Sequence, residues 1–228
     1  IYGKKLNSYS GGKYTKYTEN LGSKLGVLEI TSKKGLSISE AISVLNLDSW
    51  ATSQNFTIKA NQYQKEYGQD YNFSGNNTFL GSFISEKVNG GDGKDKLYGN
   101  SGNDKLYGEN GNDIIYGGKG KDKILGGFGN DKIYGGNDSD FLYGGKGKDQ
   151  LVGGKGKDIF KLSKGKGYDL IKDFKDKEDK ILIGSIKKLK LKNKGNNVYI
   201  YTGKDLLAKI KGAKGDLSKK GKYLVWFF

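Results

Sequence analysis

A nine-residue pattern repeats eight times without interruption between Gly90 and Lys161. Each copy begins with Gly, carries Asp at its sixth position and has an apolar residue at its eighth position. The copies read GGDGKDKLY, GNSGNDKLY, GENGNDIIY, GGKGKDKIL, GGFGNDKIY, GGNDSDFLY, GGKGKDQLV and GGKGKDIFK. A disordered Gly-rich linker would not keep an apolar residue in register eight times. The fixed period therefore predicts a solenoid, in which each repeat is one structural unit.

The chemistry of one repeat predicts how the units stack. Its first six positions are rich in Gly and polar residues, which favour turns, and its last three form a short strand with one inward side chain. Two repeats then make a coil of eighteen residues, and the sixth-position aspartates lie in two rows, about 5 Å apart within a row. Such carboxylates repel one another, and a hard cation between successive turns would remove this repulsion. The same cation could also bind the turn carbonyls, which have no partner in the sheet. Oxygen ligands of this kind indicate calcium. The rows are Asp95, Asp113, Asp131 and Asp149, and Asp104, Asp122, Asp140 and Asp158.

This stretch resembles the RTX, or haemolysin-type, nonapeptide repeat G-G-x-G-x-D-x-U-x. Three copies depart from the pattern, with Asn100 and Glu109 at the second position and Asp138 at the fourth, where it is expected to strain the turn or crowd an ion near Asp140. The resemblance implies a calcium-stabilised parallel β-roll, a right-handed β-helix. It also implies several ions, about six, one for each pair of successive aspartates in a row. The implied ligands include the turn glycines Gly90, Gly117, Gly126, Gly144 and Gly153.

The register slips by two residues after Lys161, where a degenerate ninth repeat places Asp169 at the sixth position. The segment that follows resembles the flank that closes RTX rolls, D-x-I-x-D-F-x-x-x-x-D-x-I-x-L. Within it, Asp173 and Asp179 are weaker ligand candidates than Asp169 and the repeat aspartates.

The remaining segments predict a three-part organisation. Residues 1–89 form an α+β segment of unknown role, with strands over Val27–Ile30 and Phe56–Lys59 and a short helix that begins at the capping pair Ser37 and Glu40. Residues 90–173 form the roll. Residues 174–228 alternate as strands and are expected to form a β cap. The resemblance implies that this last part also carries a type I secretion signal.

The ninth position of the repeats predicts an aromatic ladder. Tyr98, Tyr116 and Tyr134 should stack on one face of the roll, with Tyr107 and Tyr143 flanking Leu125 on the other. Such ladders could bind sugar rings, but packing on the sheet surface is the interpretation that we prefer.

Composition narrows the function classes. The chain has no Cys and no His, which excludes disulfides, a Ser-His-Asp triad and His-ligated metal sites. The net charge is +15, and residues 162–228 carry 18 Lys against 7 acidic residues. A solvated cationic surface is the preferred interpretation, with anionic polysaccharide or the cell envelope as the second; nucleic acid is disfavoured because its readers favour Arg. No run of residues is apolar enough to span a membrane.

Taken together, the sequence predicts a mostly β protein with an N-terminal α+β segment, a calcium-binding roll and a C-terminal β cap. The expected function is calcium-dependent folding of a secreted or cell-surface protein whose partners are calcium and the type I secretion machinery. The alternative is the C-terminal part of an exported enzyme (protease, lipase or epimerase-like) or of a toxin, with the catalytic region upstream of these residues. No catalytic residue stands out within the chain.

Overall fold

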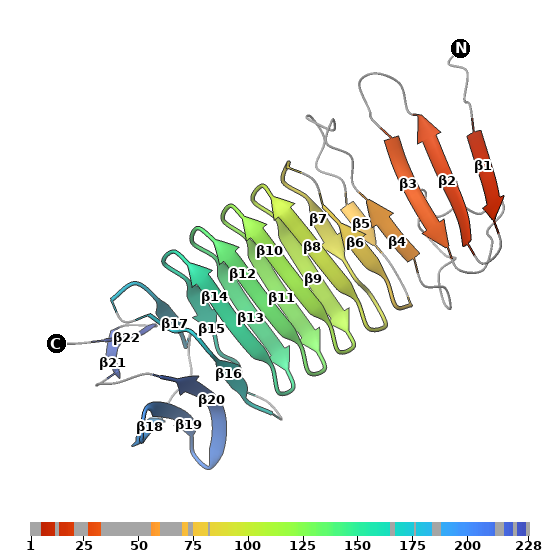
Figure 1. Cartoon of the computed structure of the whole chain (residues 1–228). Coiled ribbons are helices and arrows are strands. Elements are labelled where there is room, and N and C mark those ends of the chain that lie inside the picture. The colour runs from red at the N-terminus through yellow and green to blue at the C-terminus, as the bar shows by residue number, and fades with distance from the viewer. Residues whose placement is uncertain are drawn as a thin grey trace.

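Two long sheets form the protein, and their strands stack along one axis (Figure 1). The computed structural model describes residues 75–212, except residues 82, 165–166, 176 and 184–187, and in addition the seven strands β1–β5, β21 and β22 outside that range. The described elements are all strands, and no helix occurs among them. The helix expected from Ser37 onward lies outside the described residues. The predicted parallel β-roll is confirmed.

The eight repeats form eight strands that alternate between the two sheets. Strands eighteen residues apart pair in parallel, as the pairs Ile115–Leu97 and Ile124–Leu106 show. Each coil therefore contributes one strand to each sheet, as the repeat length predicts. The strands are β8 (Lys96–Ser101), β9 (Lys105–Asn110), β10 (Ile114–Lys119), β11 (Lys123–Phe128), β12 (Lys132–Asn137), β13 (Phe141–Lys146), β14 (Gln150–Lys155) and β15 (Ile159–Lys161).

The core is narrow because each strand of the roll directs one large side chain inward. All eight apolar residues at the eighth position have 0 % exposure. Residues on either side of them point outward, since side chains alternate along a strand. The inward set is Leu97, Leu106, Ile115, Ile124, Ile133, Leu142, Leu151 and Phe160.

The turns require left-handed backbone at two positions of each repeat. The second and fourth positions both have positive φ, for example 113° at Gly118 and 112° at Gly120. Glycine adopts such angles at no steric cost. The three departures adopt them as well, with φ of 67° at Asn100, 71° at Glu109 and 75° at Asp138. These copies therefore keep the turn geometry of the others.

The roll continues upstream of Gly90. Strands β6 (Thr78–Leu80) and β7 (Lys87–Asn89) pair in parallel with β8 and β9, and β4 (Phe56–Lys59) and β5 (Asp70–Asn72) pair in parallel with β6 and β7. Three antiparallel strands then extend the first sheet: β1 (Leu6–Gly11), β2 (Tyr14–Asn20) and β3 (Val27–Ser32). The two strands predicted in this part, Val27–Ile30 and Phe56–Lys59, are confirmed. The division of the chain into domains stays a prediction.

The C-terminal residues extend both sheets at the other end of the roll. The last coil contains β16 (Asp169–Ile171) and β17 (Lys180–Leu182). β20 (Asp205–Lys211) pairs in parallel with β16 and carries β19 (Asn197–Thr202) and β18 (Leu189–Lys194) as antiparallel neighbours. β22 (Tyr223–Trp226) pairs antiparallel with β17 and with β21 (Leu217–Lys220).

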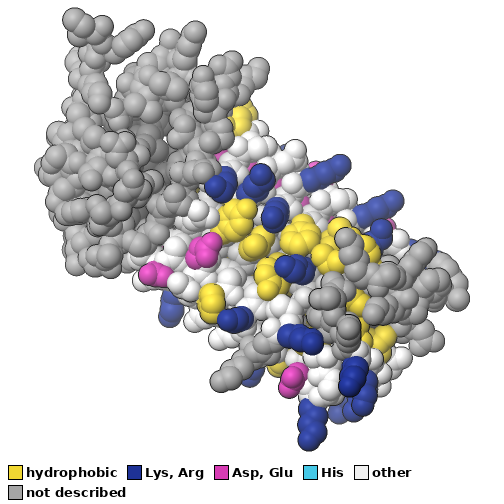
Figure 2. Space-filling model, turned by 180° about the vertical axis from the view of Figure 1, so that it is seen from behind, with side chains coloured by type: hydrophobic (Ala, Val, Ile, Leu, Met, Phe, Trp, Pro, Cys, Tyr) yellow, Lys and Arg dark blue, Asp and Glu magenta, His cyan; other side chains and the backbone are white. Residues whose placement is uncertain are grey.

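The aromatic ladder is present on the outer surface of the first sheet. The rings of Tyr98 and Tyr116 are stacked with centroids 5.0 Å apart, and those of Tyr116 and Tyr134 are 4.7 Å apart. Figure 2 shows hydrophobic side chains gathered among lysines along the roll. Because stacked tyrosines cover one another's ring faces, the ladder offers mainly ring edges to a ligand, which favours packing over sugar binding.

The arrangement at the C-terminal end predicts that the cap is needed for folding. Val198, Ile200, Leu207, Ala208 and Ile210 are buried. A chain ending at Ile183 would keep the last coil but leave the edges of β16 and β17 open. We expect it to need more calcium to fold than the full chain, or to aggregate, in a calcium titration followed by circular dichroism and light scattering.

A second truncation separates the two sheets. A chain ending at Gly212 keeps β18–β20 and loses β21 and β22, so its calcium requirement should lie between those of the other two chains. If all three fold at the same calcium concentration and stay monomeric, these strands do not serve as a cap.

Candidate metal centre

The sixth-position aspartates form two hydrogen-bonded ladders at the turns. The backbone N–H of each aspartate donates to Oδ1 of the aspartate one coil later. For example, Asp113 N lies 2.9 Å from Asp131 Oδ1, and Asp122 N lies 2.8 Å from Asp140 Oδ1. The same bond occurs at 2.8–2.9 Å for every successive pair within the eight repeats, which are 95/113, 113/131, 131/149, 104/122, 122/140 and 140/158. The structure thus brings together the pairs that the sequence predicts.

The second oxygen of each carboxylate has no such partner. Oδ2 of all eight repeat aspartates is buried and accepts no hydrogen bond within the described part of the chain, and the residues themselves are 1–2 % exposed. A buried carboxylate is stable only if it is neutralised, either by a proton or by a cation.

The pKa values of the repeat aspartates are raised because burial disfavours the charged carboxylate. Burial raises the pKa of Asp95 and Asp131 from 3.8 to about 7, and that of Asp113, Asp122 and Asp158 to about 6. Hydrogen bonds from the backbone of the previous coil oppose the shift, but desolvation is the larger effect.

Two further aspartates show how neighbouring charge adds to burial. For Asp104 and Asp140, burial and then nearby acidic groups, Glu86 in the first case and Asp122 in the second, raise the pKa to about 8. The pKa of Asp149 is also raised, mainly by burial. Without a cation, the carboxyls of Asp104 and Asp140 therefore mostly carry protons at neutral pH in the folded state, whereas the carboxyls with a pKa of about 6 are mostly ionised.

The first-position glycine of each repeat leaves the space that these oxygens occupy. A Cβ on Gly126 would lie 2.3 Å from Asp131 Oδ2 and 2.5 Å from the carbonyl oxygen of Gly144, one coil later. The same environment recurs at Gly117, with 2.3 Å to Asp122 Oδ2 and 2.6 Å to Gly135 O. A buried carboxylate oxygen and a backbone carbonyl oxygen therefore converge beside Gly117 and Gly126. All five glycines that the sequence predicts as ligands lie next to an aspartate Oδ2: Gly90, Gly117, Gly126, Gly144 and Gly153.

The donor set fits calcium. Calcium accepts carboxylate and carbonyl oxygens in flexible geometry, whereas soft metals require Cys or His, which the chain lacks. Within the described residues, no group of three or more acidic side chains is placed so that it could hold one metal ion. Each centre would therefore combine two carboxylates of one row with turn carbonyls.

Asp138 brings a third carboxylate close to one such pair. Its Oδ2 accepts a hydrogen bond from the N–H of Gly120 at 3.1 Å, one coil earlier. Its charge raises the pKa of both Asp122 and Asp140, after the larger effect of burial. The influence of Asp138 on this pair is thus electrostatic, and the expected crowding of an ion near Asp140 stays a prediction.

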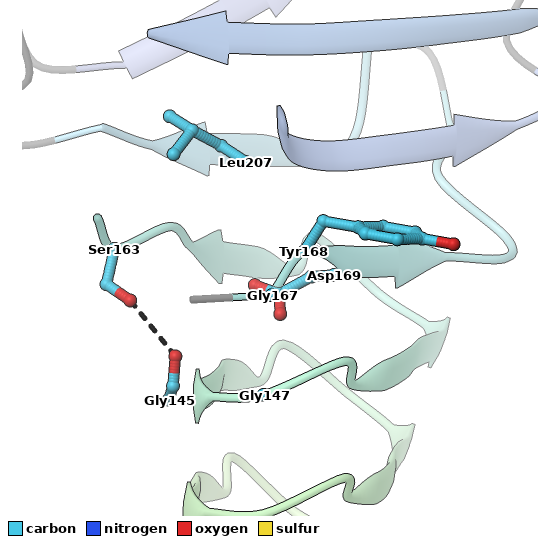
Figure 3. Close-up of a pocket in the computed structure, with 7 residues that line it drawn as sticks. All are labelled: Gly145, Gly147, Ser163, Gly167, Tyr168, Asp169 and Leu207. Carbon is cyan, nitrogen blue, oxygen red and sulfur yellow. Dashed lines mark hydrogen bonds between the residues drawn. The ribbon is translucent and has the colours of Figure 1, made fainter. Parts of the chain in front are cut away.

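The C-terminal end of the rows differs because the spacing changes. Asp169 is 5 % exposed and its carboxyl lies beside that of Asp149, twenty residues earlier, so burial and then the negative charge of Asp149 raise its pKa well above the ordinary value. Asp169 lines a pocket with Tyr168 and Leu207, next to the hydrogen bond that the Ser163 hydroxyl donates to the carbonyl of Gly145 (Figure 3).

The other two predicted ligands use both oxygens within the protein. Asp179 Oδ1 accepts from Asp158 N at 2.9 Å and its Oδ2 from Lys175 N at 2.7 Å. Asp173 accepts from the N–H groups of Gly153 and Gly154. Asp179 thus continues the row of Asp158, although the sequence offers it only as part of a flank. Their lower rank as ligands stays a prediction.

Sequence reasoning missed two members of the ladders. Asn77 and Glu86, each 3 % exposed, take the place of the sixth-position aspartate in the two turns before the first repeat. Asn77 N donates to Asp95 Oδ1 at 2.7 Å, and Glu86 N donates to Asp104 Oδ1 at 2.8 Å. The signal was available: Phe79 and Val88 stand at the eighth position eighteen residues before Leu97 and Leu106.

A second ladder at the fifth position was also missed. Here a side-chain oxygen accepts the N–H of the residue one coil later, so the bonds run opposite to those of the aspartates. Asn103 Oδ1 accepts from Lys121 N at 2.7 Å, and Asn130 Oδ1 accepts from Lys148 N at 2.8 Å. Ser139 serves in the same way for Lys157.

Comparison with known proteins identifies the class to which this site belongs. Residues 89–124 and 125–160 each match the family model of the RTX calcium-binding nonapeptide repeat, which describes four copies. The chain therefore carries RTX repeats, which bind calcium and are typical of secreted proteins. No curated protein matches the chain. Among the described residues, no helix is long and apolar enough to cross a membrane.

The glycine environment predicts the effect of one methyl group. Gly126→Ala places a Cβ against Asp131 Oδ2 and Gly144 O, and overpacking of this kind costs about 1–3 kcal/mol. We expect lower calcium affinity and a lower melting temperature in calcium. Gly203→Ala is the control for the added methyl group, because nothing lies within 4 Å of its Cβ, and its φ of 62° gives it a backbone strain that Gly126 does not have. Equal calcium affinity in the two variants would contradict this role of Gly126.

The raised pKa values predict how the calcium-free protein responds to pH. The folded state binds protons more tightly than the unfolded state, so this contribution to stability is complete below 3.8 and is lost as pH rises through about 6–8. In calcium-free buffer, circular dichroism should therefore show more β structure at about pH 5 than at about pH 8.5. With saturating calcium the order should reverse, because protons then compete with the ion. A content of β structure that increases with pH in the absence of calcium would contradict this assignment.

Proposed function

We propose that calcium held along the two aspartate rows drives folding of the roll, and that the protein takes its folded form outside the cell. The observation that carries this proposal is the set of eight buried Oδ2 atoms that accept no hydrogen bond in the described residues. A calcium ion supplies the positive charge that offsets the repulsion between two such carboxylates.

The ligands that we assign are the residues predicted from the repeats. They are the eight repeat aspartates together with the carbonyl groups of the first-position glycines, and Asp169 is assigned with Asp149. The six aspartate pairs of the repeats correspond to about six ions. Asp173 and Asp179 remain secondary candidates, because their oxygens already accept backbone N–H groups.

Energetics supports a strong dependence of folding on calcium. The core contains one large side chain per strand, so hydrophobic burial is small for the length of backbone that must be ordered. One site at a calcium concentration of 100 times its Kd adds about 2.7 kcal/mol. Two sites then contribute about 5 kcal/mol, which equals the lower end of typical domain stability.

This dependence suits an exported protein. Where calcium is scarce, folding would bury these carboxyl groups with no ion to neutralise them, so the chain stays unfolded. Where calcium is abundant the coils close. We infer that the chain leaves the cell through type I secretion and functions at the cell surface or beyond it, either as a structural or adhesive module or as the C-terminal part of an exported enzyme or toxin.

The test is a calcium titration of the full chain. Far-ultraviolet circular dichroism should change from coil to β as calcium rises into the millimolar range, and EDTA should reverse the change. Magnesium at the same concentration is the control and should have a weaker effect, because it demands octahedral geometry and gives up its water reluctantly. Identical spectra in EDTA and in calcium would rule out calcium-driven folding.

A further inference from the structure

Glu86 lies one coil upstream of the position that Asp104 occupies, outside the segments that match the repeat model. It stands at the sixth position of the nonapeptide 81–89, whose first residue is Gly81 and whose eighth is Val88. Val88 has 0 % exposure and pairs with Leu106 in the next coil. This nonapeptide therefore folds as a repeat, although it lacks two of the three glycines and the aspartate of the pattern.

The backbone around Glu86 makes the same bonds as a repeat aspartate. Its N–H donates to Asp104 Oδ1 at 2.8 Å, and its carbonyl accepts from Lys105 N at 2.8 Å. The corresponding bonds of Asp104 run to Asp122 Oδ1 and from Lys123 N, both also at 2.8 Å. Glu86 thus occupies the same position in its turn as Asp104 does one coil later, so its side chain leaves the backbone on the side where the row of aspartates lies.

The Glu86 carboxyl joins the row of Asp104. Glu86 is 3 % exposed, its N–H donates to Asp104 Oδ1, and its carboxyl is close enough for its negative charge to raise the pKa of Asp104, after the larger effect of burial. Asp104 is 1 % exposed, and its Oδ2 accepts no hydrogen bond in the described part of the chain. Two buried carboxyl groups in contact repel each other when both are ionised, and a shared cation removes the repulsion.

The other row begins differently. Asn77 occupies the matching place before Asp95: its N–H donates to Asp95 Oδ1 at 2.7 Å, and its Nδ2 donates to the carbonyl of Gly75 at 2.8 Å. The amide closes the hydrogen-bond ladder without adding a negative charge. The two rows therefore differ at this end by one carboxylate.

We propose that Glu86 and Asp104 form an additional calcium site, one coil upstream of the recognised repeats. This inference rests on the proposed calcium binding of the aspartate rows. It makes Asp104 an interior member of its row, which shares one ion with Glu86 and another with Asp122. Asp95, whose upstream neighbour is the neutral Asn77, remains at the end of its row.

The experiment counts the calcium ions bound by the full chain, by equilibrium dialysis at neutral pH. Glu86→Gln should bind one ion fewer than the unmodified protein. The variant should still fold, because Asn77 shows that an amide is accepted at this position of the other row. Glu109→Gln is the matched control and should bind the full number, since Glu109 is an exposed second-position residue.

A second comparison does not depend on Glu86→Gln. Asp104→Asn should lose one more ion than Asp95→Asn, because only Asp104 has a carboxylate on both sides. If the roll's sites began at Gly90, the two variants would be equivalent and would lose the same number.

The outcomes separate this inference from the proposed function. An unmodified protein that binds no calcium would overturn both. An unmodified protein that binds calcium, with Glu86→Gln binding the same number of ions or with equal losses in Asp95→Asn and Asp104→Asn, would overturn the Glu86 site and leave the proposed function intact.

Discussion

The hydrogen bond from one aspartate's N–H to the Oδ1 of the next aspartate in its row is the interaction on which this roll depends. It places each sixth-position carboxylate in the turn and fixes the eighteen-residue stacking of the coils. The same bond uses only one of the two carboxylate oxygens and buries the other. The hydrogen bond that sets the register of the coils therefore also buries a carboxylate whose charge no side chain of the described residues neutralises.

The abundant lysines do not supply this neutralisation. The net charge is +15, yet no lysine forms an ion pair with a repeat aspartate in the described part of the chain. Lysines at the seventh position, such as Lys96 and Lys123, are exposed. The side chain at the eighth position points into the core, so its neighbours on the strand point to solvent. Several lysines instead lie over aromatic rings, as Lys161 does over Tyr143 at 4.3 Å. An ion small enough to enter between two turns meets a need that a long, hydrated side chain cannot.

The sequence alone predicted the central coils because one rule governs them all. The period determined the coil length, the inward column and the two aspartate rows, and the structure agrees at each of these points. Prediction failed at the ends, where only part of the rule survives. Asn77 and Glu86 keep the turn's backbone role without the aspartate, so a search for Asp at the sixth position passes over them. Downstream, the spacing grows to twenty residues at Asp169 and to twenty-one at Asp179, because longer turns absorb the insertion while the strands stay paired.

The two ends of the roll face the same physical problem, since a parallel sheet that stops abruptly leaves a row of open N–H and C=O groups. The protein extends the first sheet with antiparallel strands at both ends: β1–β3 on one side, and β19 and β18 beyond the parallel strand β20 on the other. Antiparallel strands can be joined by short turns and need no further coil to continue them. The outermost strand, β18, bears the exposed Lys190, Lys192 and Lys194, and charges of this kind oppose pairing with another chain. The lysines of β18 thus have a structural role that requires no anionic partner, because they protect the edge of the first sheet against pairing with another strand.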